Sequence, residues 1–183
     1  LKDYKRALNI GCLYQNPLRG TAPNMTIEEN LALAYTRKAS PSFFALNKKD
    51  SAYFREVLST LGMGLEDRMK TKIGLLSGGQ RQAASLLMAT IAEPELLLLD
   101  EHTAALDPGA AEKVMALTKK IVEENKITTL MITHDMEYAL EYGSRTIMLD
   151  SGKIVMDLTG KEREEMTTGK LAELFYGKAH KKG

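Results

Sequence analysis

The chain carries the stretch LLLLDEHTAALDP at residues 96–108. Its first four residues form an apolar run that is too short for a helix of its own and suits a buried strand of a parallel sheet. Asp100 and Glu101 close this run, and Asp107 followed by Pro108 supplies an N-cap and a first turn for the helix behind them. A buried strand that ends on two acids and leads into a helix predicts a layered α/β domain.

A second buried strand is predicted over residues 127–133, a run rich in β-branched side chains that is followed by His134 and Asp135. The alternation of helices and strands favours right-handed crossovers between parallel strands. Ligands bind outside the carboxyl ends of such strands, so we expect these polar groups and the Asp100–Glu101 pair to face one crevice. There one carboxylate could bind Mg²⁺ and another could orient an attacking water. The alternative is that these acids are solvated loop residues.

Upstream of the first strand, the chain reads LLSGGQRQ over residues 75–82. Gly78 and Gly79 let the backbone approach a ligand closely. Ser77 stands at the start of a predicted helix, where free N–H groups and the helix dipole attract anions. Ser77 and Gln80 also have the spacing of a capping box, so the alternative interpretation is a well-capped helix without a ligand.

Taken together, these motifs resemble those of the ATP-binding subunits of ABC transporters. Residues 76–80 match the family signature LSGGQ without a mismatch, residues 96–101 resemble the Walker B strand with its following glutamate, and residues 104–107 resemble the D-loop. Gln15 lies where the Q-loop glutamine is expected, and His134 resembles the switch histidine. The resemblance covers essentially the whole chain and is greatest to bacterial import ATPases. It implies a P-loop NTPase-like layered α/β core with a helical subdomain.

The resemblance also implies a role for each polar residue near the strand ends. Asp100 would bind Mg²⁺, and Glu101 would polarise the hydrolytic water. Gln15 would contact the metal and the water and relay the state of the nucleotide to a permease. His134 would contact the γ-phosphate as a switch.

A second group of residues would act on the nucleotide of another subunit. In this family two ATP molecules are sandwiched between two head-to-tail subunits, and the signature binds the γ-phosphate across that interface. The resemblance assigns this contact to Ser77, Gly78, Gly79 and Gln80. Asp107 would act across the same interface, and it can serve as an N-cap at the same time.

The rest of the chain is predicted from local signals. Thr26 and Glu29 have capping-box spacing, and apolar residues recur at helical spacing over residues 54–61 before two glycines. We therefore expect residues 16–76 to form a mostly helical subdomain with the Q-loop at its start, residues 77–158 to form the α/β core, and residues 159–183 to form a C-terminal helix and tail. Within the core we expect a helix over 80–93 that Pro94 closes and a hairpin over 145–158. The C-terminal helix is predicted over 167–176, whereas residues 1–13 show no signal for the start of a helix.

One family motif is absent from the sequence. A phosphate-binding loop of the form Gly-x-x-x-x-Gly-Lys-Ser/Thr occurs nowhere in the sequence, and the Gly-Lys pairs at 152, 160 and 169 are each followed by another residue type. In the family this loop, and an aromatic residue that stacks on adenine, precede the Q-loop. We therefore expect that the sequence is truncated before the Q-loop, with the N-terminal part of the fold missing, and that the 183-residue chain is inactive on its own.

The amino-acid composition and net charge exclude several classes of protein. Hydrophobic residues make up 44% of the chain and charged residues 27%, which fits a globular domain rather than a disordered one. The formal net charge is +1, so no field strong enough to bind nucleic acid by charge alone is expected. No run reaches the roughly 18 apolar residues that span a bilayer, so any membrane association is expected to go through a partner.

The expected function is therefore that of an ATP hydrolase with ATP and Mg²⁺ as cofactors. As a homodimer or with a paired ATPase subunit, it would couple ATP hydrolysis to solute transport by a transmembrane permease at the cytoplasmic face of the cell membrane. One alternative is a soluble ABC-type ATPase that acts on DNA or ribosomes, and another is a remnant that does not bind nucleotide. Transport is favoured because a short helical segment without a long coiled coil separates Gln15 from Ser77, and because the net charge is near neutral.

Overall fold

The structure is a computed structural model that describes residues 2–38 and 48–179. Two units, Leu1–Ile132 and Thr133–Gly183, make up the chain, and each is described by itself. The first contains α1 Asp3–Arg6, β1 Ile10–Leu13, α2 Ile27–Tyr35, α3 Lys48–Ser59, α4 Gly78–Thr90, β2 Leu96–Asp100, α5 Pro108–Asn125 and β3 Thr128–Ile132, with 3₁₀ turns at Pro17–Gly20, Thr36–Lys38 and Ile73–Leu75. No helix in these described ranges is both long and apolar enough to cross a bilayer.

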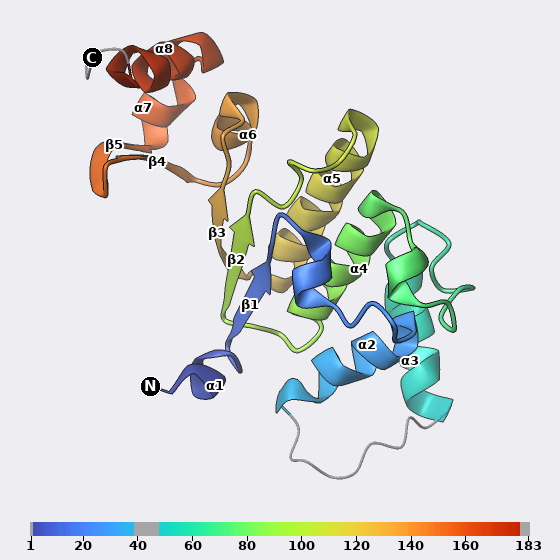
Figure 1. Ribbon diagram of the computed structural model, residues 1–183. Helices are drawn as coiled ribbons and strands as arrows, with labels where there is room; N and C mark the ends of the chain where they lie inside the picture. Colours follow the sequence, from blue (N-terminus) through green and yellow to red (C-terminus); the bar gives the residue numbers. More distant parts are fainter. Residues whose placement is uncertain (1, 39–47, 180–183) are drawn as a thin grey trace. The chain divides into compact units, whose positions relative to one another are not determined.

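A parallel sheet with the strand order β1-β2-β3 forms the centre of the first unit (Figure 1). β2 pairs with β1 through Leu99 and Leu13, and with β3 through Asp100 and Ile132. All three strands therefore end at the same edge of the sheet. This arrangement confirms the parallel α/β core that the apolar run before Asp100 predicts.

Helices α4 and α5 cover one face of this sheet (Figure 1). The side chains buried in this layer are Leu13, Leu86, Ala89, Leu97, Leu99 and Ile127. On β3, however, Leu130 and Ile132 are 53% and 52% exposed, so the prediction of a second buried strand is wrong. The reason is that β2 pairs with a strand on each side, whereas in the described sheet β3 pairs with β2 alone.

The helical segment between β1 and α4 packs against α4 around a second apolar core, to which Ala83, Ala84 and Leu87 of α4 contribute. Helices α2 and α3 and the turns of residues 60–76 bury Ile27, Leu31, Phe54, Leu58, Leu61, Leu65 and Ile73. Thr26 caps α2 as the sequence predicts, with its hydroxyl accepting from the Glu29 N–H and the Glu29 carboxylate accepting from the Thr26 N–H at 2.7 Å. Residues 60–72 are turns and irregular chain rather than helix, so the segment is less helical than expected.

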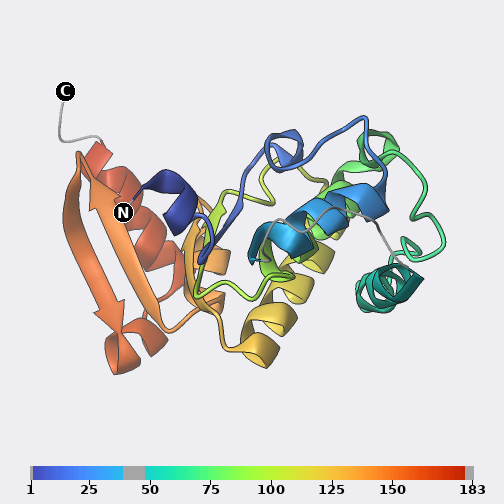
Figure 2. The ribbon, with the colours of Figure 1, turned by 90° about the horizontal axis from the view of Figure 1, so that it is seen from below.

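The second unit contains α6 Met136–Glu141, β4 Arg145–Asp150, β5 Lys153–Thr159, α7 Gly160–Glu164 and α8 Thr168–Ala179. β4 and β5 form the predicted antiparallel hairpin (Figure 2). Its turn places Ser151 and Gly152 at φ 51° and 76°, the left-handed pair that a tight hairpin requires. Arg163 of α7 donates to the carbonyl oxygens of Leu140 at 2.6 Å and Tyr142 at 2.9 Å, which ties α7 to the end of α6.

Four helices differ from expectation. Residues 3–6 form the single turn α1, which is closed by bonds from the N–H groups of Lys5 and Arg6 to the Lys2 carbonyl and therefore needs no capping signal. α4 ends at Thr90, because Glu93 adopts φ 49° before Pro94, a position where proline disfavours helix. α6 and α7 were not predicted at all, since both are too short to show a periodic pattern.

Candidate functional site

The signature residues form the first turn of α4. The Ser77 hydroxyl accepts from the Gln80 N–H at 3.3 Å, and the Gln80 side-chain oxygen accepts from the Ser77 N–H at 3.4 Å. This is the capping box that the sequence predicts. It satisfies two of the four N–H groups that a helix start leaves without an intrahelical partner.

The other two N–H groups of this turn belong to Gly78 and Gly79. Neither has an acceptor among the described residues. Two adjacent backbone donors at the positive end of a thirteen-residue helix suit the oxygens of a phosphate group. The donor set therefore fits the triphosphate that the family resemblance implies, and the capping box does not compete for these donors.

Close packing against the segment after β2 also favours glycine at both positions. A Cβ atom on Gly79 would lie 3.0 Å from the Ala110 Cβ, and one on Gly78 would lie 3.3 Å from a methyl carbon of Leu106. Between these two contacts, Asp107 caps α5 by accepting from the Ala110 N–H at 3.0 Å. The signature and the D-loop residue are thus neighbours in the same subunit, and the role of Asp107 across an interface stays a prediction.

The side chain of Gln80 is occupied within the chain. Its amide nitrogen donates to the Met63 carbonyl at 3.4 Å, and its oxygen accepts from Arg68 at 3.5 Å as well as from Ser77. These bonds join the start of α4 to the irregular segment of residues 60–72. Holding that segment is the role that the geometry supports for Gln80, and its contact with a phosphate stays a prediction.

Asp100 and Glu101 lie where β2 ends. Asp100 is exposed, and Glu101 is half-buried with φ 45°, a left-handed backbone that is uncommon outside glycine. The Glu101 N–H donates to the Ile132 carbonyl at 3.0 Å, which extends the bonding between β2 and β3 past the end of the strand. Among the residues described, no cluster of three acidic, histidine or cysteine side chains could hold a metal alone. A single exposed carboxylate fits Mg²⁺, which takes most of its ligands from phosphate and water.

Gln15 lies at the same edge of the sheet. It is exposed and follows β1, whose last residue, Leu13, pairs with Leu99 of β2. Parallel pairing therefore brings Gln15 and Glu101 to the ends of adjacent strands. Gln82 ties this segment to the signature helix, because its amide donates to the Tyr14 carbonyl at 3.1 Å.

Sequence reasoning missed Gln82 and did not assign a role to His102. Gln82 is fully buried, and its position four residues before the buried Leu86, on the same face of α4, is a signal that could have been read from the sequence. His102 is buried beside Thr118 of α5, with 3.3 Å between the His102 Nε2 and the Thr118 hydroxyl. Burial lowers the pKa of His102 to about 4, so its ring is neutral at pH 7.

His134 belongs to the second unit. It is exposed and precedes α6, which Asp135 caps by accepting from the N–H groups of Glu137 at 2.8 Å and Tyr138 at 3.1 Å. The Thr133 hydroxyl accepts from the Asp135 N–H at 3.0 Å and fixes the turn around His134. The expectation that His134 and Asp135 face the same crevice as Glu101 stays a prediction, because the two units are described separately.

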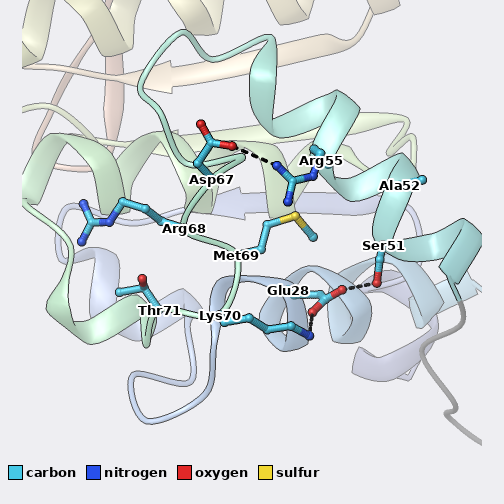
Figure 3. Close-up of a pocket in the computed structure, with 9 residues that line it drawn as sticks. All are labelled: Glu28, Ser51, Ala52, Arg55, Asp67, Arg68, Met69, Lys70 and Thr71. Carbon is cyan, nitrogen blue, oxygen red and sulfur yellow. Dashed lines mark hydrogen bonds and ion pairs between the residues drawn. The ribbon is translucent and has the colours of Figure 1, made fainter.

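A cavity of about 550 Å³ in the helical segment holds none of the predicted site residues (Figure 3). Glu28 of α2 is buried at its wall, where it accepts hydrogen bonds from Ser51 and Lys70. Arg55 pairs with Asp67 at 2.9 Å, and Arg68 points away from that pair (Figure 3). Four of its five charged side chains pair with one another, Glu28 with Lys70 and Arg55 with Asp67.

A second cavity, of about 260 Å³, lies next to the Gln15 segment. Apolar side chains of β1, α2 and α4 form most of its wall, and Arg37 contributes a guanidinium group. Two nitrogens of that group, Nε and one Nη, are buried and have no hydrogen-bond partner in the described part of the chain. Burial also lowers the pKa of Arg37, which means that the cation is poorly solvated where it stands.

Comparison with known proteins identifies close relatives of this chain. The ABC transporter family profile matches residues 2–104. A tyrosine transport ATP-binding protein of Clostridioides difficile (strain R20291) is 42% identical over 175 residues, which are 96% of this chain and 70% of that protein. A phosphonates import ATP-binding protein of Lactococcus lactis subsp. lactis (strain IL1403) is 35% identical over 165 residues, which are 88% of this chain and 65% of that protein.

The fold has solved counterparts as well. The dimeric structure of a post-hydrolysis state of an ATP-binding cassette bound to ADP and Pi superposes with a TM-score of 0.70 and 29% sequence identity. The match covers 87% of this chain and 68% of that one. This likeness confirms the layered α/β fold with a helical subdomain that the sequence resemblance implies.

Proposed function

Because the chain belongs to the ABC transporter family, we propose that it forms part of an ATP-binding subunit that couples ATP binding and hydrolysis to solute transport by a membrane permease. The observation that carries this proposal is the start of α4. There the capping box leaves the Gly78 and Gly79 N–H groups for a phosphate. The neighbouring segment holds the Asp100–Glu101 pair at the end of a parallel strand.

Each of the predicted site residues would act on the nucleotide through its own chemistry. The signature N–H groups donate to the γ-phosphate of an ATP held by a second subunit in a head-to-tail dimer. Asp100 would hold Mg²⁺, and Glu101 would accept a hydrogen bond from the attacking water and orient it. Gln15 would contact the metal and the water, and His134 would contact the γ-phosphate. Bound Mg²⁺ neutralises the charge that develops on the phosphates.

The permease would dock at the cavity that contains Arg37. Its wall is mostly apolar, and its guanidinium group has two buried nitrogens without an acceptor among the described residues. Such a donor pair is matched by a carboxylate, because planar donors and two oxygens can bond side by side. An acidic side chain on a cytoplasmic segment of the permease is therefore the proposed occupant. The adjacent Gln15 segment would relay the nucleotide state to it.

The docking surface can be tested with Arg37→Gln in the complete subunit, coexpressed with its permease and purified in detergent. We expect Arg37→Gln to reduce recovery of the permease about tenfold or more, since a buried ion pair loses one partner. Lys120→Gln, which removes one charge from the exposed surface of α5, is the matched control and should not change recovery. Equal recovery with both variants would place the docking surface elsewhere.

A soluble ATPase that acts on DNA or ribosomes is the competing function. Co-purification with the permease and co-sedimentation with ribosomes, measured on the same preparation, separate the two. The proposal predicts a stable complex with the permease and no ribosome binding beyond that of an unrelated protein. Ribosome binding without permease binding would contradict it. The peripheral location at the cytoplasmic face of the membrane follows from the proposed complex.

A further inference from the structure

The turn that follows β2 is anchored to α5 by a buried polar pair. His102 is 2% exposed and Thr118 is 5% exposed, and their side chains meet at 3.3 Å between Nε2 and the hydroxyl oxygen. His102 is the residue directly after Glu101, whereas Thr118 lies in the middle of α5. This bond therefore fixes the start of the turn to a helix that does not otherwise carry site chemistry.

The direction of this hydrogen bond follows from the donors available. The Thr118 hydroxyl has one proton, and it donates that proton to the Val114 carbonyl of its own helix at 2.8 Å. The hydroxyl oxygen can then only accept from His102, so Nε2 carries the proton of the neutral ring. Removing the hydroxyl would leave a buried N–H without an acceptor, which is costly in a packed interior.

Glu101 is held between this anchor and the sheet. On one side its N–H donates to the Ile132 carbonyl at 3.0 Å, and on the other its carbonyl accepts from the Ala104 N–H at 3.0 Å. Its φ of 45° is strained for a residue with a side chain and persists only where the surroundings enforce it. We therefore expect the strained backbone of Glu101 to depend on the buried hydrogen bond between His102 and Thr118.

We propose that His102 is a positioning residue, which holds Glu101 in its left-handed backbone through the bond to Thr118 and thereby aims the Glu101 carboxylate. The inference rests on the proposed function only for the role of that carboxylate in hydrolysis. If Glu101 could rotate, its carboxylate would no longer hold the attacking water, because a proton acceptor must lie within hydrogen-bond distance of the proton it accepts. The anchor itself is a property of the chain without nucleotide.

The first test measures hydrogen exchange at the Glu101 amide in this chain, without nucleotide or Mg²⁺. Thr118→Val keeps the shape of the side chain and removes the acceptor, so exchange at Glu101 should accelerate about tenfold or more through local opening. Thr90→Val is the matched control, because the Thr90 hydroxyl is also buried in a helix but bonds only to its own helix at 2.9 Å. Equal exchange at Glu101 in both variants would overturn the inference.

The second test uses the ATPase activity of the complete subunit. His102→Leu should lower kcat about tenfold while leaving the KM for ATP unchanged, and His102→Gln, which can still donate to Thr118, should restore most of the rate. A structural role alone would lower stability in both variants without this difference in kcat. Equal kcat values for the Leu and Gln variants would overturn the positioning role. A wild-type subunit without ATPase activity would instead contradict the proposed function, while the exchange experiment would still decide the anchor.

Discussion

At the first turn of α4, individual residues have separable tasks. Ser77 and Gln80 satisfy each other's N–H groups, while Gly78 and Gly79 leave theirs for a ligand and permit contact with Leu106 and Ala110. A substitution at either glycine therefore changes packing as well as phosphate binding. Ser77 is the position where the cap can be tested without altering that contact.

Ser77→Ala should lower the free energy of unfolding by about 1 kcal/mol, because it removes the acceptor of the Gln80 N–H. Urea unfolding of the chain measures this change. Ser85→Ala is the control, since the Ser85 hydroxyl donates to the Arg81 carbonyl of the same helix at 2.8 Å and caps no free N–H group. Its effect should be smaller than that of Ser77→Ala, because the Arg81 carbonyl keeps its bond within the helix. Equal losses in the two variants would show that the capping box does not stabilise α4.

Single residues differ in how far their roles could be predicted. The capping residues Ser77 and Asp107 were predicted because a cap and its helix are adjacent in the sequence. The bond between His102 and Thr118 was not predicted, because it joins residues from different elements whose spacing carries no pattern. Arg37 was missed for the same reason, since its burial depends on the packing of β1, α2 and α4.

Among the elements, β1 and α4 approach each other closely at Gly11. A Cβ atom on Gly11 of β1 would lie 2.5 Å from the Ala89 carbonyl oxygen of α4. Gly11→Ala should therefore destabilise the chain by about 2 kcal/mol or more, because the backbone of the helix must move to make room. The control is Gly20→Ala, where no atom lies within 4 Å of the added carbon. A similar free energy of unfolding for both variants would contradict this packing.

The contact between α2 and α3 should depend on pH through Glu28. Burial acts to raise the pKa of this carboxyl, but hydrogen bonds from Lys70 and Ser51 outweigh it and hold the pKa below its ordinary value of 4.5. The folded state thus prefers the charged form, so the carboxylate contributes stability above pH 4.5 that is lost as the pH falls through the folded pKa. Glu28→Gln cannot titrate and should show a smaller loss of stability on acidification, measured by urea unfolding at several pH values. Parallel curves for the two proteins would contradict the assignment.

The elements themselves were predicted where a periodic pattern or a cap is present. This holds for α2, α5, β2 and the β4–β5 hairpin. The burial of β3 was predicted wrongly, because composition indicates a strand but not its place in a sheet. The short helices α1, α6 and α7 are held by contacts and local bonds that leave no periodic signal.

At the scale of the whole molecule, the residues that the family resemblance assigns to one site are divided between the two units. The first unit contains Gln15, the signature, the Asp100–Glu101 pair and Asp107. Parallel strand pairing brings Gln15 and Glu101 to the ends of adjacent strands, and the contact of α4 with the start of α5 brings the signature next to Asp107. His134 lies in the second unit. Motifs in the sequence predict which residues a family site requires, and the convergence of His134 with the residues of the first unit stays a prediction. The head-to-tail dimer stays a proposal, which rests on the signature residues and Asp107 of the first unit.

The most direct test of the account is Glu101→Gln in the complete subunit, with hydrolysis, ATP binding and molecular mass in solution measured together. The substitution keeps the size of the side chain and removes its charge, so hydrolysis should fall about 100-fold or more while ATP binding persists. ATP should then convert the variant into a long-lived dimer. Glu95→Gln, an exposed glutamate just before β2, is the control and should behave as wild type. Hydrolysis by Glu101→Gln at the wild-type rate, with no ATP-dependent dimer, would contradict the account.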